Sequence, residues 1–466
     1  MQTRLLISNV LATLFAVTSI AGASEQPPNI ILFMADDLGY GALGCYGQKK
    51  IKTPNIDRLA AEGVRFTQAY SGSNVCAPAR SVLMTGLHTG HTPVRANGVG
   101  KHLYDSDVTI AEVFKAKGYV TGMFGKWGLG NEHSPGRPNL QGFDTFFGQL
   151  EQVHAHFYYP FWIWRDNEAY PLCDNNGGKR SRYVHDVLHE KSLDFIRTNK
   201  DEPFFCYVPC IIPHVELVVP EDSERPYYDL FPKVRIDDPR TGYIGSEHGY
   251  ATLAGMVSRM DRGVGEMLSL LKELKIDDRT LFLFTSDNGG QGGPWVKMTD
   301  FFKANAPLRG YKGSFFEGGI RVPMIARWPG RIKPGRTSDH VLGFQDVLPT
   351  LAEVAGASTP AGLDGISFAP TLFDRGAQRE HGYLYWEYPH GEQLEQAVRM
   401  KNWKLIKTAD GKISLYNLAD DLAEASDVAA SHPDVVAELT PLFSTARSSP
   451  RDYAAIDRPT IDDYVR

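Results

Sequence analysis

The sequence predicts an α/β fold: a large, mostly parallel sheet sandwiched by helices, followed by a smaller C-terminal α+β domain of antiparallel strands and a helix. Three observations predict it. Segments of helical spacing alternate with short apolar runs over most of the chain, as in a parallel sheet covered by helices. After about residue 375, short strand candidates separated by turns replace this alternation. The 466 residues, 42% hydrophobic and 22% charged, have a globular composition and are enough for two or three domains.

The first predicted strand covers residues 29–34, a continuous apolar run that suits a strand buried on both faces. In each of the next four units, a segment of helical spacing precedes an apolar run. These units cover residues 56–66, 109–124, 193–208 and 254–284. Gly63 and Gly118 are helix stops in the first two units.

Long polar connections, rich in glycine and proline, separate these units at residues 128–180, 213–248 and 289–320. We expect structureless loops there, and loops of this length in a compact domain usually build a binding site. Beyond residue 375 we expect four short strands within residues 383–416 and a helix at residues 435–443. These expectations divide the mature chain into a larger domain, residues 24–375, and a C-terminal α+β subdomain, residues 376–466.

Residues 1–23 have the features of a secretory signal peptide: Arg4 supplies the positive charge, residues 5–20 are uncharged and mostly apolar, and residues 21–23 are small. An N-terminal membrane anchor is the alternative, disfavoured by the polar residues within the stretch. No later segment has the apolar run that a spanning helix needs. We therefore expect a periplasmic or secreted protein with no membrane contact after cleavage. The net charge of -6 argues against a nucleic-acid partner.

Five cysteines are an odd number for an exported chain, in which cysteines usually pair. Their spacing is not that of a metal finger. If one of them has another fate, four remain for pairing, although the sequence alone does not assign partners. The five are Cys45, Cys76, Cys173, Cys206 and Cys210.

The segment that begins at Cys76, Cys-Ala-Pro-Ala-Arg-Ser, is the densest chemical signal in the chain. Pro78 suits the first turn of a helix, so we expect Cys76 at the helix N-terminus, where the helix dipole favours negative charge. Arg80 is within reach of the same end. Such an environment acidifies a thiol or stabilises an oxyanion. A buried structural cysteine is the plainer alternative, and a cysteine hydrolase would need a His and Asn pattern that is not evident.

Polar residues follow two of the predicted strands. Asp36 and Asp37 end the first apolar run, and Asp287 and Asn288 end another. Because ligands bind at the carboxyl ends of parallel strands, two adjacent strands would bring three carboxylates and one amide together. Such oxygen ligands suit Ca²⁺ or Mg²⁺ and not zinc. Ordinary turns are the alternative interpretation of each segment taken alone.

Cys76, Pro78 and Arg80 match Cys-x-Pro-x-Arg, and here the chain resembles the type I sulfatases, the formylglycine-dependent, arylsulfatase-like branch of the alkaline phosphatase superfamily. Residues 81–86 continue the family's Ser-x-x-x-Thr-Gly pattern. Further matches extend over nearly the whole mature chain, at residues 125–127, 213–214, 287–289 and 318–323. The resemblance implies that residues 24–375 form a sulfatase catalytic domain and that the protein is a sulfuric ester hydrolase.

The resemblance also implies a modification and a metal site. In this family a maturation enzyme oxidises the motif cysteine to formylglycine, an aldehyde, and the position here is Cys76. This conversion would leave four cysteines. The metal ligands carried over are Asp36, Asp37, Asp287 and Asn288, with the modified Cys76 beside them. We favour Ca²⁺, although ligand type alone does not exclude Mg²⁺.

The implied mechanism starts from the hydrated aldehyde. One hydroxyl, made more acidic by the cation and Arg80, attacks sulfur, and the second later expels sulfate. Lys126 and Lys312 match the family's sulfate-binding lysines, and His214 matches the general acid that protonates the leaving alcohol. Each lysine, taken singly, would be a solvated surface residue, and His214 a neutral surface histidine.

One position departs from the family. The family commonly has a histidine two residues after the first lysine, where it assists the formylglycine hydroxyl, and this chain has Gly128. Either another residue fills the role, or the metal and a neighbouring carboxylate handle the deprotonation. The candidate replacements are His133, His154, His156 and His185.

The substrate expected for an exported enzyme with a loop-built pocket is a sulfated carbohydrate, with aryl sulfates as additional substrates. His154 and His156, in an aromatic stretch, are the substrate-binding candidates, although core packing explains most of those aromatics. Weaker candidates for the far rim are Tyr385, Trp386, His390 and Arg399. The alternative functions are a phosphonate or phosphodiester hydrolase of the same superfamily and a non-catalytic binder of sulfated glycans.

Overall fold

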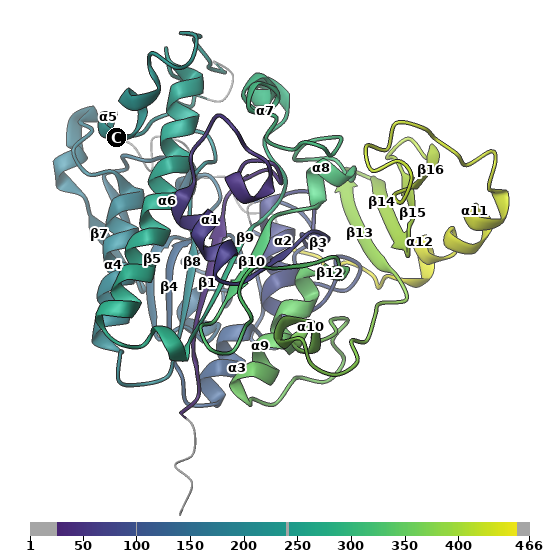
Figure 1. The fold of residues 1–466 in the computed structure, drawn as a ribbon, viewed down its shortest axis with the longest axis horizontal. Helices are drawn as coiled ribbons and strands as arrows, with labels where there is room; N and C mark the ends of the chain where they lie inside the picture. Colours follow the sequence, from purple (N-terminus) through teal and green to yellow (C-terminus); the bar gives the residue numbers. More distant parts are fainter. Residues whose placement is uncertain (1–25, 99, 239–241, 454–466) are drawn as a thin grey trace, which may run out of the picture.

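The computed structural model describes residues 26–98, 100–238 and 242–453, and its centre is one large mixed sheet (Figure 1). The strands of this sheet are β1 (Asn29–Ala35), β2 (Val64–Phe66), β4 (Val120–Lys126), β5 (Thr145–Gln149), β6 (Trp162–Arg165), β7 (Glu168–Pro171), β8 (Phe204–Pro209), β9 (Thr280–Ser286), β10 (Met324–Arg327) and β11 (Arg336–Ser338). Their order is β11-β2-β10-β9-β1-β8-β4-β5-β6-β7. The neighbours β9, β1, β8, β4 and β5 run parallel, so the predicted α/β class is confirmed.

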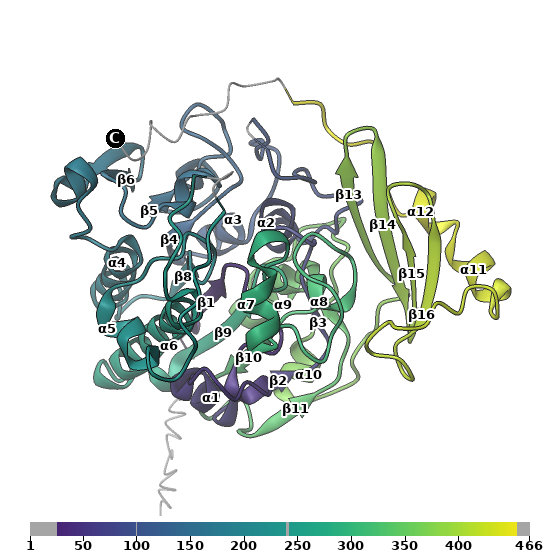
Figure 2. The same ribbon diagram turned by 90° about the horizontal axis from the view of Figure 1, so that it is seen from above.

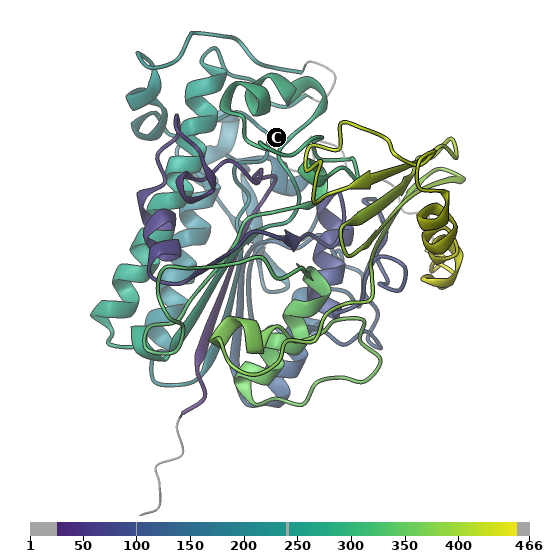
Figure 3. The same ribbon diagram turned by 45° about the vertical axis from the view of Figure 1, so that its right-hand side comes forward.

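Helices cover both faces of this sheet (Figure 3). The cores on the two faces include α1 (Pro54–Ala61), α4 (Val184–Thr198) and α6 (Gly249–Glu273) on one side, and α2 (Cys76–Thr85), α3 (Ile110–Ala116) and α9 (Val347–Ala355) on the other. Successive residues of β1 point to opposite faces, Ile31 into the first core and Leu32 into the second. This alternation explains why the run at residues 29–34 is apolar throughout.

The C-terminal part is a separate four-stranded antiparallel sheet (Figure 2). Its strands, in spatial order, are β13 (Leu384–His390), β14 (Gln393–Met400), β15 (Trp403–Lys407) and β16 (Ile413–Asn417). One face packs against Tyr70, Phe315 and Ile320 of the larger part. The other face is covered by α11 (Pro433–Leu439) and α12 (Leu442–Thr445). The boundary at residue 375 stays a prediction.

Two expectations about the chain path are wrong. The connection at residues 128–180 is not structureless, because it contains β5, β6 and β7, which extend the sheet at one edge. The connections at 213–248 and 289–320 contain short helices: α5 (Glu221–Glu224), α7 (Val296–Phe302) and α8 (Glu317–Ile320). The helix expected at residues 435–443 is two helices, α11 and α12. Pro441 lies between them and has no N–H to continue the first.

Three shorter elements complete the larger part. The strands β3 (Ala69–Tyr70) and β12 (Leu342–Gly343) pair in parallel, and α10 (Ala369–Phe373) follows α9. Within the described ranges, no helix is both long and apolar enough to cross a membrane. The segment interpreted as a signal peptide, residues 1–23, lies outside those ranges.

Candidate active site

The acidic residues expected at one edge of the sheet lie together. Asp36 and Asp37 follow β1, Asp287 and Asn288 follow β9, and the two strands are parallel neighbours with Ala35 opposite Ser286. The Asp37 backbone N–H donates to Asp287 Oδ1 at 3.0 Å, and Asn288 Nδ2 donates to Asp37 Oδ1 at 2.7 Å. The four side chains are buried. The parallel pairing therefore delivers all four to one point.

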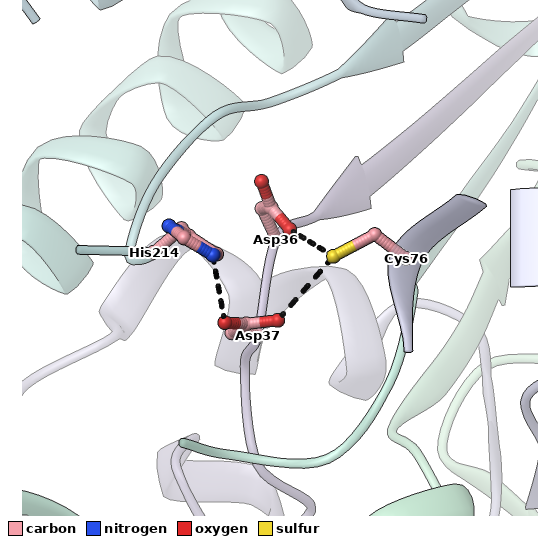
Figure 4. A group of neighbouring side chains, drawn as sticks. All are labelled: Asp36, Asp37, Cys76 and His214. Atoms are coloured by element: carbon pink, nitrogen blue, oxygen red, sulfur yellow. Dashed lines mark hydrogen bonds and ion pairs between the residues drawn. The ribbon is translucent and has the colours of Figure 1, made fainter. Parts of the chain in front are cut away.

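Cys76 reaches the same point from α2. It is the first residue of that helix, and its Sγ lies 3.5 Å from Asp36 Oδ1 and 3.9 Å from Asp37 Oδ1 (Figure 4). The residue is 1% exposed, and every residue of α2 is buried. Burial raises the pKa of the Cys76 thiol, and the charges of Lys126 and Lys312 lower it by less. Burial thus works against activation of the unmodified Cys76 as a thiolate.

Three cations surround the carboxylates. Arg80, one turn along α2, donates to Asp287 Oδ2 at 2.8 Å. Lys126, the last residue of β4, places Nζ 2.7 Å from Asp36 Oδ2. Lys312 places Nζ 2.7 Å from Asp37 Oδ2 and 3.4 Å from Cys76 Sγ. Burial lowers the pKa of Lys312, but Asp37 and the other acids raise it well above its usual value.

His214, in the loop after β8, completes this group. Its Nε2 lies 3.3 Å from Asp37 Oδ2, and the His156 ring stacks on it with centroids 4.0 Å apart. Burial lowers the pKa of His214 well below its usual value, and Lys312 and Lys126 lower it further. Nε2 of the imidazole is thus aimed at the carboxylates.

A cavity of about 300 Å³ lies beside this group. Its lining includes Asn97, Lys101, Gly128, Gln152 and His156. It meets the buried group at two places. Asn97 Oδ1 accepts from the N–H of Ala77, the residue after Cys76, at 2.9 Å, and His156 stacks on His214. A substrate in the cavity would therefore lie next to the cysteine and the histidine.

The comparisons with known proteins identify the family. The sulfatase family pattern matches residues 28–357, and the pattern described as N-sulphoglucosamine sulphohydrolase, C-terminal, matches residues 311–447. The chain belongs to the sulfatase family. Human arylsulfatase A is 32% identical over 90% of this chain and 82% of its own length. N-acetylgalactosamine-6-O-sulfatase of Bacteroides thetaiotaomicron is 29% identical over 92% of this chain and 94% of its own.

Solved structures agree. The crystal structure of Ps i-CgsB superposes with a TM-score of 0.78 at 30% identity, covering 92% of this chain and 95% of its own. The phosphonate monoester hydrolase of Agrobacterium radiobacter has a TM-score of 0.66 at 23% identity, covering 90% of this chain and 95% of its own, which shows a shared fold. The protein is thus a sulfuric ester hydrolase with an alkaline-phosphatase-like fold, so the non-catalytic alternative is set aside.

The oxygen-rich group of this sulfatase fits a hard metal ion. Asp36, Asp37, Asp287 and Asn288 offer carboxylate and amide oxygens. Asn288 Oδ1 is buried and has no hydrogen-bond partner among the described residues, although its Nδ2 is bonded. A buried amide oxygen left without a partner is costly, and a cation would satisfy it. The donor set therefore fits Ca²⁺ or Mg²⁺.

The four histidines proposed as replacements at position 128 have different positions. His133 is exposed beside Glu132, and His185 is buried with Nδ1 3.4 Å from Cys210 Sγ. His154 is buried, with Nε2 3.0 Å from the Trp162 carbonyl. Only His156, of these four, contacts His214 and lines the cavity.

The side chain over Gly128 is one that the sequence did not suggest. Gly128 has a φ of +81°, and a Cβ built on it would lie 2.0 Å from Gln152 Nε2. The amide of Gln152 therefore fills the space that a side chain at position 128 would need. No motif marks Gln152, and only the parallel pairing of β4 with β5 brings its segment to Gly128.

The C-terminal sheet reaches the site through a residue that we did not propose. Tyr388 of β13 hydrogen-bonds the backbone of Asn97, and burial, then the nearby Cys76, raises its pKa. Of the rim candidates, Trp386 donates to the Ser71 carbonyl, Arg399 contacts the Tyr70 hydroxyl, Tyr385 is buried in the outer core of this sheet, and His390 pairs with Glu395.

The cysteines do not pair as expected. All five lie in the described ranges, and all are free thiols in the structure. Cys206, in the middle of β8, and Cys210, just after it, are both buried and unbonded to each other. The two packed cores stabilise the fold, so it needs no disulfide bond.

Proposed function

We propose that this sulfatase removes sulfate from a sulfated carbohydrate by means of a formylglycine made from Cys76 by a maturation enzyme. One observation carries the proposal: Cys76 begins α2 at a buried point where three carboxylates, two lysines and His214 converge. The relatives support the substrate class. One is an N-acetylgalactosamine-6-O-sulfatase, and Ps i-CgsB has been solved with k-i-k-neocarrahexaose.

The metal is assigned to Asp36, Asp37, Asp287 and Asn288, next to position 76. We favour Ca²⁺, because the donors are oxygens and the ion accepts irregular coordination. When bound, a divalent cation polarises the ester and makes a neighbouring hydroxyl more acidic, and the hydrated aldehyde supplies that hydroxyl.

The chain's own residues hold the ester and the leaving group. The three buried carboxylates are matched by three cations, so a divalent ion would leave the site positive by two charges and ready for an anion. Lys126 and Lys312 are assigned to the sulfate oxygens, where they stabilise the charge that develops. Arg80 orients Asp287 and the Lys126 backbone, to whose carbonyl it donates at 2.6 Å. His214 Nε2 faces the same point and is assigned the proton for the leaving oxygen; the negative charge of a bound sulfate ester would offset the lysines and favour the protonated imidazole.

The decisive experiment combines mass spectrometry with a substrate screen. The peptide that contains residue 76, taken from protein matured in its native host, should carry an aldehyde in place of the thiol. The same protein should release sulfate from defined sulfated mono- and oligosaccharides, and the Cys76→Ala variant should lose at least about a thousandfold of that rate. Cys173→Ala, an exposed cysteine, is the matched control.

Two outcomes would contradict the proposal. Fully modified, metal-loaded protein that releases no sulfate from any sugar sulfate would remove the substrate class. Faster turnover of phosphodiesters or phosphonates than of sulfate esters, on one preparation, would move the enzyme to the phosphonate and phosphodiester branch.

Residues 1–23 lead to a proposal about location. We propose that they direct export and are removed, so that the working enzyme is periplasmic or secreted. N-terminal sequencing of the exported protein should begin at Ser24, and an intact residue 1 on exported protein would refute cleavage.

A further inference from the structure

Gln152 stands out because it lines the cavity beside the active site while both polar atoms of its amide are buried without a partner. Both Nε2 and Oε1 are buried, and neither makes a hydrogen bond to any residue that the structure describes. Leaving an amide unpaired in the interior is energetically costly. Such a cost is removed when a ligand supplies the missing donor and acceptor.

The Gln152 amide lies over Gly128. The Gly128 N–H donates to the Leu150 carbonyl at 2.9 Å, which ties the segment after β4 to the segment after β5. Since a Cβ at position 128 would lie 2.0 Å from Gln152 Nε2, the glycine makes the room that the amide occupies. The left-handed φ of +81° also disfavours any other residue there. The position of the Gln152 amide therefore depends on a glycine at position 128.

The cavity that Gln152 lines adjoins the active site. Gln152 lines it together with Asn97, which bonds the residue after Cys76, and His156, which stacks on His214. Of the cavities in the described residues, this one lies against both His156 and Asn97, so it is assigned to the substituents next to an ester at the buried group. An amide donates and accepts, as does a hydroxyl.

We propose that Gln152 binds the sugar hydroxyl adjacent to the sulfate ester and so determines which sulfated sugars are hydrolysed. The inference rests on the proposed carbohydrate function. A site that hydrogen-bonds a substrate hydroxyl discriminates strongly against the analogue that lacks it, because the protein's own buried polar atoms are then left unpaired. Gln152 acts in recognition and leaves the reacting atoms to the residues described above.

The test uses matched pairs of substrates. These are methyl galactosides sulfated at O2, O3, O4 or O6, each compared with the analogue in which a hydroxyl next to the ester is replaced by hydrogen. The reference substrate is 4-nitrophenyl sulfate, which has no hydroxyl. For its best galactoside, the mature wild-type enzyme should prefer the hydroxyl-bearing member in kcat/KM by about tenfold or more.

In Gln152→Met, which keeps the side-chain length but removes the hydrogen bonds, the preference should fall to within about twofold, mainly through KM. Turnover of 4-nitrophenyl sulfate should stay within about twofold of wild type. Gln152→Ala should give the same loss of preference, which covers the case in which the methionine variant folds poorly. Gln393→Met, at an exposed position of β14, is the matched control.

The outcomes separate the two proposals. A retained preference in both Gln152 variants, or an equal loss on the sugar and the aryl substrate, overturns the role of Gln152. A wild-type enzyme that hydrolyses 4-nitrophenyl sulfate but none of the galactosides or other sulfated sugars overturns the carbohydrate function on which it rests.

Discussion

Asp36, Asp37 and Asp287 are buried carboxylates that each lie within 2.8 Å of a different cation. These cations are the buried Lys126 and Arg80 and the partly exposed Lys312. This pairing makes every member dependent on its partner, because an uncompensated charge in the interior is strongly destabilising. The proposed function assigns the same cations to the reaction, because their contacts with the carboxylates hold them where the anionic ester is expected to bind. At the scale of single residues, one set of contacts thus stabilises the fold and prepares the site.

Gly128 is the residue for which the structure makes the sharpest stability prediction. Gly128→Ala should lower the free energy of unfolding by roughly 1–3 kcal/mol, because alanine is strained at positive φ and its Cβ meets Gln152. Urea unfolding measures this change. The double variant Gly128→Ala with Gln152→Ala removes the clash. Only the strain of alanine at positive φ then remains, so the loss of unfolding free energy should be about 1 kcal/mol. Equal losses in the single and double variants would contradict the contact.

The sequence predicted the residues that meet at this site but not the one that shapes the cavity. Asp36 and Asp287 follow apolar runs, and the ends of parallel strands meet at one edge, so composition and order were sufficient there. Gln152 follows β5, a strand hidden in a connection expected to be structureless, and its position depends on the pairing of Lys126 with Gln149. Strand neighbours of this kind are set by tertiary packing, which a single sequence does not encode locally.

At the scale of elements, β1 and β9 each contribute two polar residues just past their last hydrogen-bonded pair. The two strands therefore supply two of the four oxygen-bearing side chains each, and the fixed register determines how these oxygens face one another. The alternation of side chains does not distinguish the rim residues of β13. Tyr388 and His390 are two residues apart and share one face, and sequence alone did not show that Tyr388 is the one that approaches Cys76.

Removal of the metal should affect both activity and stability. Extensive chelation should reduce sulfate release by about a hundredfold or more, since polarisation of the ester is lost. The melting temperature should fall, because an ion bound only by the folded state stabilises it. Ca²⁺ should restore both, and titration of Ca²⁺ against Mg²⁺ on the stripped enzyme identifies the preferred ion. Full activity in protein shown to be metal-free by elemental analysis would contradict the assignment.

At the scale of the whole molecule, buried ion pairs join the C-terminal sheet to the larger part. Lys404 Nζ lies 2.8 Å from Glu317 Oε1 and 2.9 Å from Glu424 Oε1, and all three side chains are fully buried. Arg399 adds a contact to the Tyr70 hydroxyl. The chain then returns to the larger part, where Arg451 pairs with Asp107. Charged contacts as well as apolar contacts therefore join the C-terminal sheet to the larger part of the molecule.

Replacement of Lys404 tests the contribution of these ion pairs to stability. Lys404→Met should destabilise the protein by about 3–5 kcal/mol, because Glu424 and Glu317 lose their shared cation. Denaturant unfolding measures the loss, and Lys412→Met, at an exposed position, is the control. A change below about 1 kcal/mol would show that the carboxylates find other partners.

Acid should destabilise the whole molecule through its buried histidines. Burial lowers the pKa of His88 to about 4 and those of His154 and His185 to about 3, from 6.5. Below pH 6.5 the unfolded chain binds more protons than the folded one. Stability is therefore complete above about pH 6.5 and is lost as the pH falls towards 3.

The slope of this loss gives the measurement. Each histidine contributes at most about 1.4 kcal/mol per pH unit to the unfolding free energy. His185→Asn should flatten the slope between pH 6.5 and 4, and His133→Asn, on the surface, should leave it unchanged. An identical slope in both variants would show that His185 is not held neutral.

The burial of Cys76 also has a consequence in time. Its thiol is 1% exposed, at the start of a helix in which every residue is packed between sheet and loops. Under the proposed conversion of Cys76 to formylglycine, the maturation enzyme would have no access to the side chain once α2 has docked, so conversion would have to precede folding. Maturation and folding would then compete for the nascent chain, and a molecule that folded first would keep its thiol. The fraction of active enzyme in a preparation would be set by that competition before purification.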